Sequence, residues 1–180
     1  MTLSKKSFLG AGLRKALFLD RDGVVNVEKN YLHKIEDFEL MDGIIDVCRT
    51  YQEGGYLIII VTNQSGISRG YYSEEDFAQL SDWMVERFKT FGVTISYIYH
   101  CPHHESIDGA CACRKPEAGM FLEAQATYRL DMAGSVMIGD NERDIEAALK
   151  AGVGKNILLS HRASTSKATK IIYSLRELLC

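Results

Sequence analysis

Two aspartates, Asp20 and Asp22, lie one residue apart and directly follow the apolar run Ala16–Leu19. A short, uninterrupted apolar run bounded by a turn signal such as Gly23 is typical of a fully buried strand in a parallel sheet. Ligands of such sheets bind just beyond the carboxyl ends of the strands, so both carboxylates are expected where chemistry is done. Taken alone, an Asp-x-Asp pair is also typical of an acidic, solvated turn.

The rest of the chain decides between these interpretations, because three later segments each lead into side chains suited to phosphoryl transfer. These side chains are Thr62, Lys115, Asp140 and Asp144. Carboxylates, a hydroxyl and an ammonium are the groups that a phosphoryl-transfer site with an aspartate nucleophile requires. The combination therefore favours catalysis over a plain acidic turn.

Each of these residues has an expected role. Asp20 attacks phosphorus to form an aspartyl-phosphate, which divides one difficult hydrolysis into two easier steps. Asp22 acts as general acid for the leaving alkoxide and then as general base for the attacking water. Thr62 and Lys115 hold the phosphate oxygens on which negative charge spreads in the transition state.

A magnesium ion is expected in the same place. An anionic nucleophile and an anionic phosphate repel each other by ~4 kcal/mol for unit charges 4 Å apart at an effective dielectric of 20. Mg2+ removes this obstacle and prefers oxygen ligands, which Asp20, Asp140 and the backbone carbonyl of Asp22 can supply.

A second cluster combines cysteine and histidine. Cys101-x-His103, seven further residues and then Cys111-x-Cys113 provide one nitrogen and three sulfur ligands, the number that a closed structural zinc site requires. A closed site leaves no position for substrate, so the zinc would stabilise a loop and fix the direction of the residues that follow it. Two alternatives stay open: reduced cysteines without metal, and His104 in place of His103.

The remaining pattern alternates strands with helices. Apolar runs predict strands at 16–19, 57–61, 95–99, 136–138 and 156–159, and helical periodicity predicts helices at 42–53, 73–91, 117–128, 141–150 and 171–179. Such alternation requires a doubly wound, Rossmann-like parallel sheet with right-handed crossovers. No large cap insertion is visible, so loops 27–41, 67–72 and 101–113 must select the substrate.

Length and composition limit the class of protein. The 180 residues indicate one domain, 14–180, after a flexible polar leader, 1–13. A net charge of −3 argues against nucleic-acid binding, and no apolar run approaches the ~20 residues that span a bilayer. Three cysteines within thirteen residues favour metal over disulfides in a cytoplasmic protein. We expect a cytoplasmic monomer that binds a small molecule.

The motifs resemble a known superfamily. The order Asp-x-Asp-Gly, Thr-Asn-Gln, Lys-Pro and Gly-Asp-x-x-x-Asp, from Lys15 to about Leu159, is similar to that of the haloacid dehalogenase phosphatases. The runs 20–23, 62–70, 101–104 and 111–116 resemble those of the D-glycero-D-manno-heptose 1,7-bisphosphate 7-phosphatases. Histidinol-phosphate phosphatases have a similar zinc loop but usually lack the run Gln-Ser-Gly-Ile-x-Arg-Gly.

The resemblance implies a Mg2+-dependent phosphatase with an aspartyl-phosphate intermediate and zinc on Cys101, His103, Cys111 and Cys113. It implies removal of the C7 phosphate in heptose precursor synthesis for lipopolysaccharide or another surface polysaccharide. The substrate-binding residues expected on this basis are Glu28, Lys29, Asn30, Tyr31, Asn63, Gln64, Ser65, Arg114 and Asn141. A histidinol-phosphate phosphatase and a non-catalytic zinc-loop binding module are the alternatives.

Three further residues bear on substrate and phosphate binding. Arg114, planar and always charged, is suited to forked hydrogen bonds with a second phosphate at the far end of a bisphosphate. Val24 stands where the superfamily usually has a threonine, which removes one hydroxyl from the first motif. Asn141 follows Asp140 where heptose phosphatases often have a lysine, so any contact from that lysine is weakened or replaced.

Overall fold

The computed structural model describes residues 12–161 and 165–179. Six parallel strands form one sheet in the order β3-β2-β1-β4-β5-β6. The strands are β1 (Ala16–Leu19), β2 (Leu57–Asn63), β3 (Ile95–Cys101), β4 (Val136–Gly139), β5 (Lys155–Leu159) and β6 (Lys170–Ile172). The α-helices are α1 (Ile44–Glu53), α2 (Glu74–Thr90), α3 (Glu105–Asp108), α4 (Gly119–Tyr128) and α5 (Glu142–Lys150), and 3-10 helices cover Ile35–Asp37 and Leu175–Leu178.

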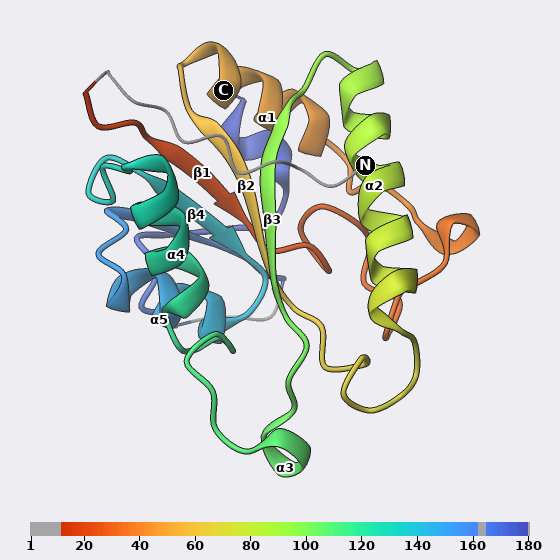
Figure 1. Ribbon diagram of the computed structural model, residues 1–180. Helices are drawn as coiled ribbons and strands as arrows, with labels where there is room; N and C mark the ends of the chain where they lie inside the picture. The colour runs from red at the N-terminus through yellow and green to blue at the C-terminus, as the bar shows by residue number, and fades with distance from the viewer. Residues whose placement is uncertain (1–11, 162–164, 180) are drawn as a thin grey trace.

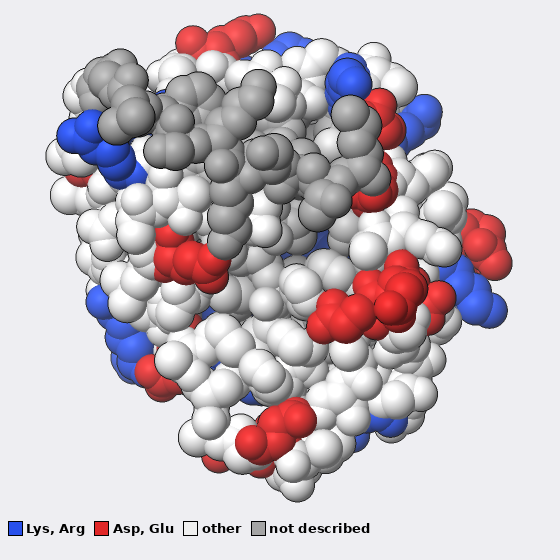
Figure 2. Space-filling view, viewed as in Figure 1, with Lys and Arg blue, Asp and Glu red and all other residues white. Residues whose placement is uncertain are grey.

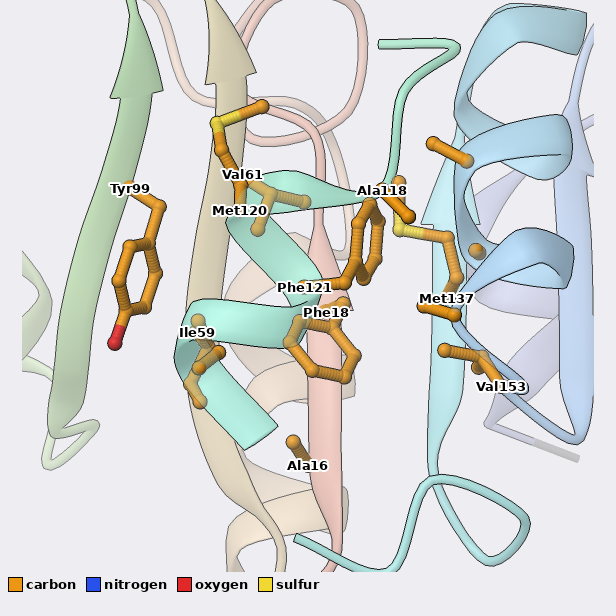
Figure 3. Close-up of a cluster of buried hydrophobic side chains, with 14 of the residues drawn as sticks. Ala16, Phe18, Ile59, Val61, Tyr99, Ala118, Met120, Phe121, Met137 and Val153 are labelled. Carbon is orange, nitrogen blue, oxygen red and sulfur yellow. The ribbon is translucent and has the colours of Figure 1, made fainter. Parts of the chain in front are cut away.

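Helices cover both faces of the sheet, as Figure 1 shows for α2 on one side and α4 and α5 on the other. Successive residues of a strand point to opposite faces, so β1 sends Phe18 into one core and Leu17 and Leu19 into the other. In the first core Phe18 packs on Phe121 of α4 with ring centroids 4.9 Å apart, as Figure 3 shows. Because both faces are covered, the central strands β1 and β4 are apolar throughout. The predicted doubly wound α/β fold is confirmed.

The end of the chain differs from the sequence expectation. The helix predicted for 171–179 is wrong: β6 pairs with β5 and is followed by a 3-10 helix that Ser174 caps. The apolar spacing of this segment suits a helix, but the free edge of β5 offers Ile171 and Ile172 a strand partner, and β-branched residues fit that pleated surface. Residues 1–11 of the predicted leader lie outside the described residues.

Two surface properties bear on the class of protein. Among the described residues, no helix combines the length and the hydrophobicity needed to cross a bilayer. On the face shown in Figure 2, Lys and Arg side chains are scattered among acidic ones. This distribution matches the slightly negative net charge of the chain.

Candidate active site

The topology of the sheet brings the predicted catalytic residues together. Strands β2, β1 and β4 are neighbours, and Thr62, Asp20 and Asp140 lie at their carboxyl ends. The backbone N–H of Asp20 donates to the carbonyl of Ile138, which joins the end of β1 to β4. A cavity of about 450 Å3 opens over this edge. Most of the predicted site residues line it: Asp20, Asp22, Glu28, Asn30, Tyr31, Thr62, Asn63, Gln64, Ser65, Arg114 and Asp140.

Lys115 lies beneath this cavity, fully buried, at the centre of an ionic network. Its Nζ is 2.9 Å from Oδ1 of Asp20, 2.7 Å from Oδ1 of Asp144 and 2.8 Å from the carbonyl of Val61. Asn63 fixes the backbone of Lys115, because its side-chain amide donates to the Lys115 carbonyl and accepts from the Lys115 N–H, both at 3.0 Å. Both the backbone and the side-chain Nζ of Lys115 are therefore fixed by hydrogen bonds, which hold the ammonium beside Asp20.

Burial and crowding change the acidity of the carboxylates. Burial raises the pKa of Asp20 to about 7, helped by the charges of Asp144 and Asp140 and opposed by Lys115. Burial and the charge of Asp144 likewise raise the pKa of Asp140 to about 6. Burial alone would lower the pKa of Lys115, but Asp144 and Asp20 outweigh it and raise that pKa, so the ammonium stays charged. This network lacks enough positive charge for all its carboxylates.

The same carboxylates have the chemistry of a magnesium site. Ligand oxygens of Asp20, Asp140 and Asp144 lie within 4.8 Å of one another. Gly23 makes room for this cluster: it has φ +85°, and a Cβ there would collide with the carboxylate of Asp140. Both oxygens of Asp144 have protein partners, Lys115 on Oδ1 and the N–H of Asn141 on Oδ2. The contacts of Asp20 with Lys115 and with the N–H of Arg21 both use Oδ1, so Oδ2 of Asp20 and the carboxylate of Asp140 are left for a cation.

The cysteine and histidine side chains form a compact cluster. Sγ of Cys101 lies 3.0 Å from Sγ of Cys113 and 3.6 Å from that of Cys111, and Nδ1 of His103 lies 3.3 Å from Sγ of Cys113. Four soft ligand atoms this close suit a tetrahedral zinc ion. His104 points elsewhere: its ring nitrogens contact Arg69 and Ser106, so the geometry favours His103 over His104.

The thiols of this cluster differ in acidity. Burial raises the pKa of Cys101. Burial also acts on Cys111, but the backbone N–H of Arg114 and neighbouring side chains outweigh it and lower the pKa of that thiol to about 7. A thiolate is the form that binds metal, so Cys111 is prepared for a cation at neutral pH.

The loop that carries the cluster also positions two arginines of the cavity. Arg114 donates to the carbonyl of His103 at 3.0 Å, and Nη2 of Arg69 is 2.6 Å from Nε2 of His104. Both arginines and His104 line the cavity, as does Arg143 at the start of α5. The sequence interpretation missed Arg69, His104 and Arg143. Arg69 could have been found, because it belongs to the run 62–70 that carries the resemblance.

Two predicted substrate-binding residues lie outside the lining of the cavity. Lys29 donates to the carbonyl of Asp37 and pairs with Glu39 at 3.2 Å. Asn141 caps α5, since its side chain accepts from the N–H of Arg143. The structure thus shows protein partners for both side chains.

Comparison with known proteins gives the family. A Campylobacter jejuni protein named D-glycero-alpha-D-manno-heptose-1,7-bisphosphate 7-phosphatase is 48% identical over 165 residues, which cover 92% of this chain and 94% of that protein. The chain belongs to the haloacid dehalogenase-like phosphatase family. A D-glycero-beta-D-manno-heptose-1,7-bisphosphate 7-phosphatase of Yersinia pestis is 47% identical over 151 residues, or 80% of this chain and 79% of the relative.

Solved structures of the same family share the fold. The HAD-hydrolase-like family model matches residues 112–176 of the phosphatase. The crystal structure of D,D-heptose 1,7-bisphosphate phosphatase from B. bronchiseptica, complexed with magnesium and phosphate, superposes with a TM-score of 0.80 and 29% identity. The match covers 92% of this phosphatase and 98% of that chain. The sequence-based assignment to a phosphoric monoester hydrolase of this superfamily is confirmed.

Proposed function

We propose that this phosphatase removes the C7 phosphate of D-glycero-D-manno-heptose 1,7-bisphosphate in precursor synthesis for a surface polysaccharide. The observation that carries the proposal is one cavity that combines Asp20, paired with Lys115, with two arginines, Arg114 and Arg69, that contact the zinc loop. Asp20 suits the reacting phosphate, and Arg114 and Arg69 suit the second phosphate of a bisphosphate. The names of the relatives support this substrate.

The first half-reaction transfers the phosphoryl group to the enzyme. A carboxylate oxygen of Asp20 forms a bond to phosphorus while the bond between phosphorus and the C7 oxygen breaks. Asp22, which lines the same cavity, gives its proton to that oxygen, and the heptose 1-phosphate leaves. Lys115 and Thr62 stabilise the charge on the phosphoryl oxygens.

The second half-reaction restores the enzyme. Asp22, now a carboxylate, takes a proton from a water molecule whose oxygen bonds to phosphorus. The bond between Asp20 and phosphorus breaks, inorganic phosphate leaves, and Asp20 returns as a carboxylate beside Lys115. The charged ammonium at 2.9 Å favours this ionised form.

Mg2+ belongs to the proposal as a cofactor, held by Asp20, Asp140 and the backbone carbonyl of Asp22. The crowded, buried oxygens fit such an ion. When bound, it neutralises charge between the nucleophile and the phosphate. Zinc belongs to it as a structural ion on Cys101, His103, Cys111 and Cys113.

The remaining predicted residues have roles that stay within the proposal. Glu28, Asn30, Tyr31 and Ser65 line the cavity and would contact the sugar. Asn30 and Tyr31 have positive φ angles of 41° and 58°, an uncommon conformation that places the Tyr31 ring against Tyr71 with centroids 4.6 Å apart. The monomeric state and cytoplasmic location stay predictions.

The test is phosphate release from purified protein with Mg2+, followed by 31P NMR. D-glycero-D-manno-heptose 1,7-bisphosphate should lose its C7 signal, keep its C1 signal, and react faster than histidinol phosphate. Faster hydrolysis of histidinol phosphate would overturn the substrate. No turnover of any phosphate ester would instead favour a binding module.

A further inference from the structure

Gln64 is buried between two catalytic residues. Its side-chain Nε2 lies 2.9 Å from Oδ2 of Asp22 and 2.8 Å from Oγ1 of Thr62. Its Oε1 accepts a hydrogen bond from the hydroxyl of Tyr72. Only 2% of the residue is exposed. An amide nitrogen has two hydrogens, so both donors of Gln64 are used inside the protein and none is left for a sugar hydroxyl.

Asp22 is held from its other side by Arg21. The guanidinium of Arg21 is buried and donates to both carboxylate oxygens of Asp22, at 3.0 Å from Nη2 to each. The same Nη2 is 2.9 Å from the carbonyl of Leu32 in the loop 27–41. Asn26 adds a hydrogen bond of 3.1 Å to Oδ1. The carboxyl group that must give and take a proton is therefore fixed by three neighbouring side chains.

We propose that Gln64 is a positioning residue for Asp22 and does not bind the sugar hydroxyls of the substrate. It orients the carboxyl group of Asp22 toward the oxygen of the leaving alcohol. This inference rests on the proposed function, because it assigns Gln64 to the proton transfer of that reaction. A neutral amide suits this role, since an oxygen of a carboxylic acid still accepts a hydrogen bond and Gln64 can hold Asp22 in both protonation states.

Tyr72 completes the arrangement. Its ring stacks on His33 of the loop 27–41, with centroids 5.2 Å apart and planes inclined by 8°. Burial raises the pKa of Tyr72 to about 12, so its hydroxyl stays a donor to Gln64 at neutral pH. A half-turn of the Gln64 amide would bring its oxygen against the carboxylate of Asp22, which only accepts, so the hydrogen bond to Asp22 would be lost.

The test is the dependence of kcat/KM on the leaving group, for a series from simple alkyl monophosphates without hydroxyl groups to 2,4-dinitrophenyl phosphate. A dinitrophenolate leaves without a proton, whereas an alkoxide requires one. In Gln64→Leu we expect kcat/KM to fall about 10- to 100-fold for the alkyl esters, part of the 10²–10⁴-fold that general acid catalysis supplies. For the dinitrophenyl ester the fall should be under about 3-fold, so the plot against leaving-group pKa becomes steeper.

Two further variants complete the experiment. Tyr72→Phe, which keeps the ring, should steepen the plot in the same direction but less, and it serves if Gln64→Leu does not fold. Gln52→Leu is the matched control. The side-chain amide of Gln52 in α1 also donates and accepts a hydrogen bond, to the carbonyl of Gly92 and from the N–H of Thr94, but it does not line the cavity. It should leave the plot unchanged.

Equal losses on alkyl and aryl esters would overturn the inference, as would a loss on heptose bisphosphate, measured beside the series, with no loss on the alkyl esters. The first result would mean a structural role and the second a substrate contact. The wild-type enzyme separates this inference from the proposed function. If it hydrolyses heptose bisphosphate but Gln64→Leu keeps the wild-type slope, only the placement of Gln64 fails.

Discussion

The two candidate metal sites of this phosphatase are built in opposite ways. The carboxylate cluster takes Asp20 and Asp140 from distant parts of the sequence and brings them together at the ends of the neighbouring strands β1 and β4, with Lys115 against Asp20. The cysteine cluster takes its four candidate ligands from residues 101 to 113, the end of β3 and the segment that directly follows it. One depends on the topology of the whole sheet, and the other on local spacing.

This difference matches the two roles. The carboxylate cluster contains buried groups with raised pKa values and faces an open cavity, so it can accept a substrate and an exchangeable cation. The cysteine cluster is closed, and its ligands anchor Arg114 and the segment that leads to Lys115. In the proposed function the first cluster performs the chemistry, and the second positions groups for it.

The largest effect is expected at the nucleophile. Asp20→Asn should lower kcat at least ~10³-fold, because the covalent intermediate cannot form. The fold should persist, since Lys115 keeps Asp144 at 2.7 Å. Phosphate release and circular dichroism measure the two properties. Asp46→Asn, on the exposed face of α1, is the control and should keep full activity. Activity above about one per cent of the wild type in folded Asp20→Asn would contradict the assignment of the chemistry to the carboxylate cluster.

A smaller but substantial effect is expected from the zinc loop. Elemental analysis should find one zinc per chain in the wild type and none in Cys111→Ala. The loss should lower kcat/KM about 10- to 100-fold, the range for residues that orient the groups in direct contact with a metal or substrate. Cys48→Ala is the matched control, because Cys48 is a buried core residue of α1. It should keep the zinc. Full activity of zinc-free Cys111→Ala would show that the loop positions nothing.

Arg114 tests what the loop positions. Arg114→Ala should cost ~1.5–3 kcal/mol of specificity for the bisphosphate, the range for a hydrogen bond to a charged group. Hydrolysis of a small aryl phosphate should barely change, because that substrate has no second phosphate. Arg49→Ala, on the exposed surface of α1, should change neither rate. Equal losses on both substrates would place Arg114 in the chemistry itself.

The smallest effect concerns pH and Mg2+. In the metal-free folded protein the pKa values of Asp20 and Asp140 are about 7 and about 6, whereas on unfolding both return to the ordinary value of 3.8. Between the ordinary and the raised pKa values, the folded state therefore binds more protons than the unfolded state. Its stability should therefore fall as pH rises from about 5.5 to 8. Mg2+ requires the ionised carboxylates, so it should raise the Tm by more degrees at pH 8 than at about pH 5.5. A larger shift at the lower pH would contradict this; Asp20→Asn should show less dependence on pH.

Much of the fold was predictable from local pattern. The strand Ala16–Leu19 was predicted with its observed bounds, because its residues are buried on both faces and form one apolar run. The convergence of Asp20, Thr62, Lys115 and Asp140 followed from the rule that parallel strands end at one edge. The last segment was not predictable in this way, since three-residue β6 exists only by pairing with β5.

The supporting contacts of the site could not be read from spacing. Asn63 and Lys115 are 52 residues apart in the chain, and their paired hydrogen bonds depend on the fold alone. The same holds for Gln64, whose bond to Asp22 joins residues 42 apart. The family resemblance predicted that these amides belong to the site, but only the structure shows which protein groups they contact.

The central claim, that Asp20 is the nucleophile, has one most direct measurement. Enzyme quenched during turnover is reduced with borohydride, which converts an aspartyl-phosphate to homoserine, and is then digested with trypsin. The fragment Ala16–Arg21 contains a single carboxylate side chain, that of Asp20. We expect mass spectrometry to find homoserine at position 20 of this fragment, and none without substrate. Homoserine at position 22 or 140, with position 20 unchanged, would contradict the account.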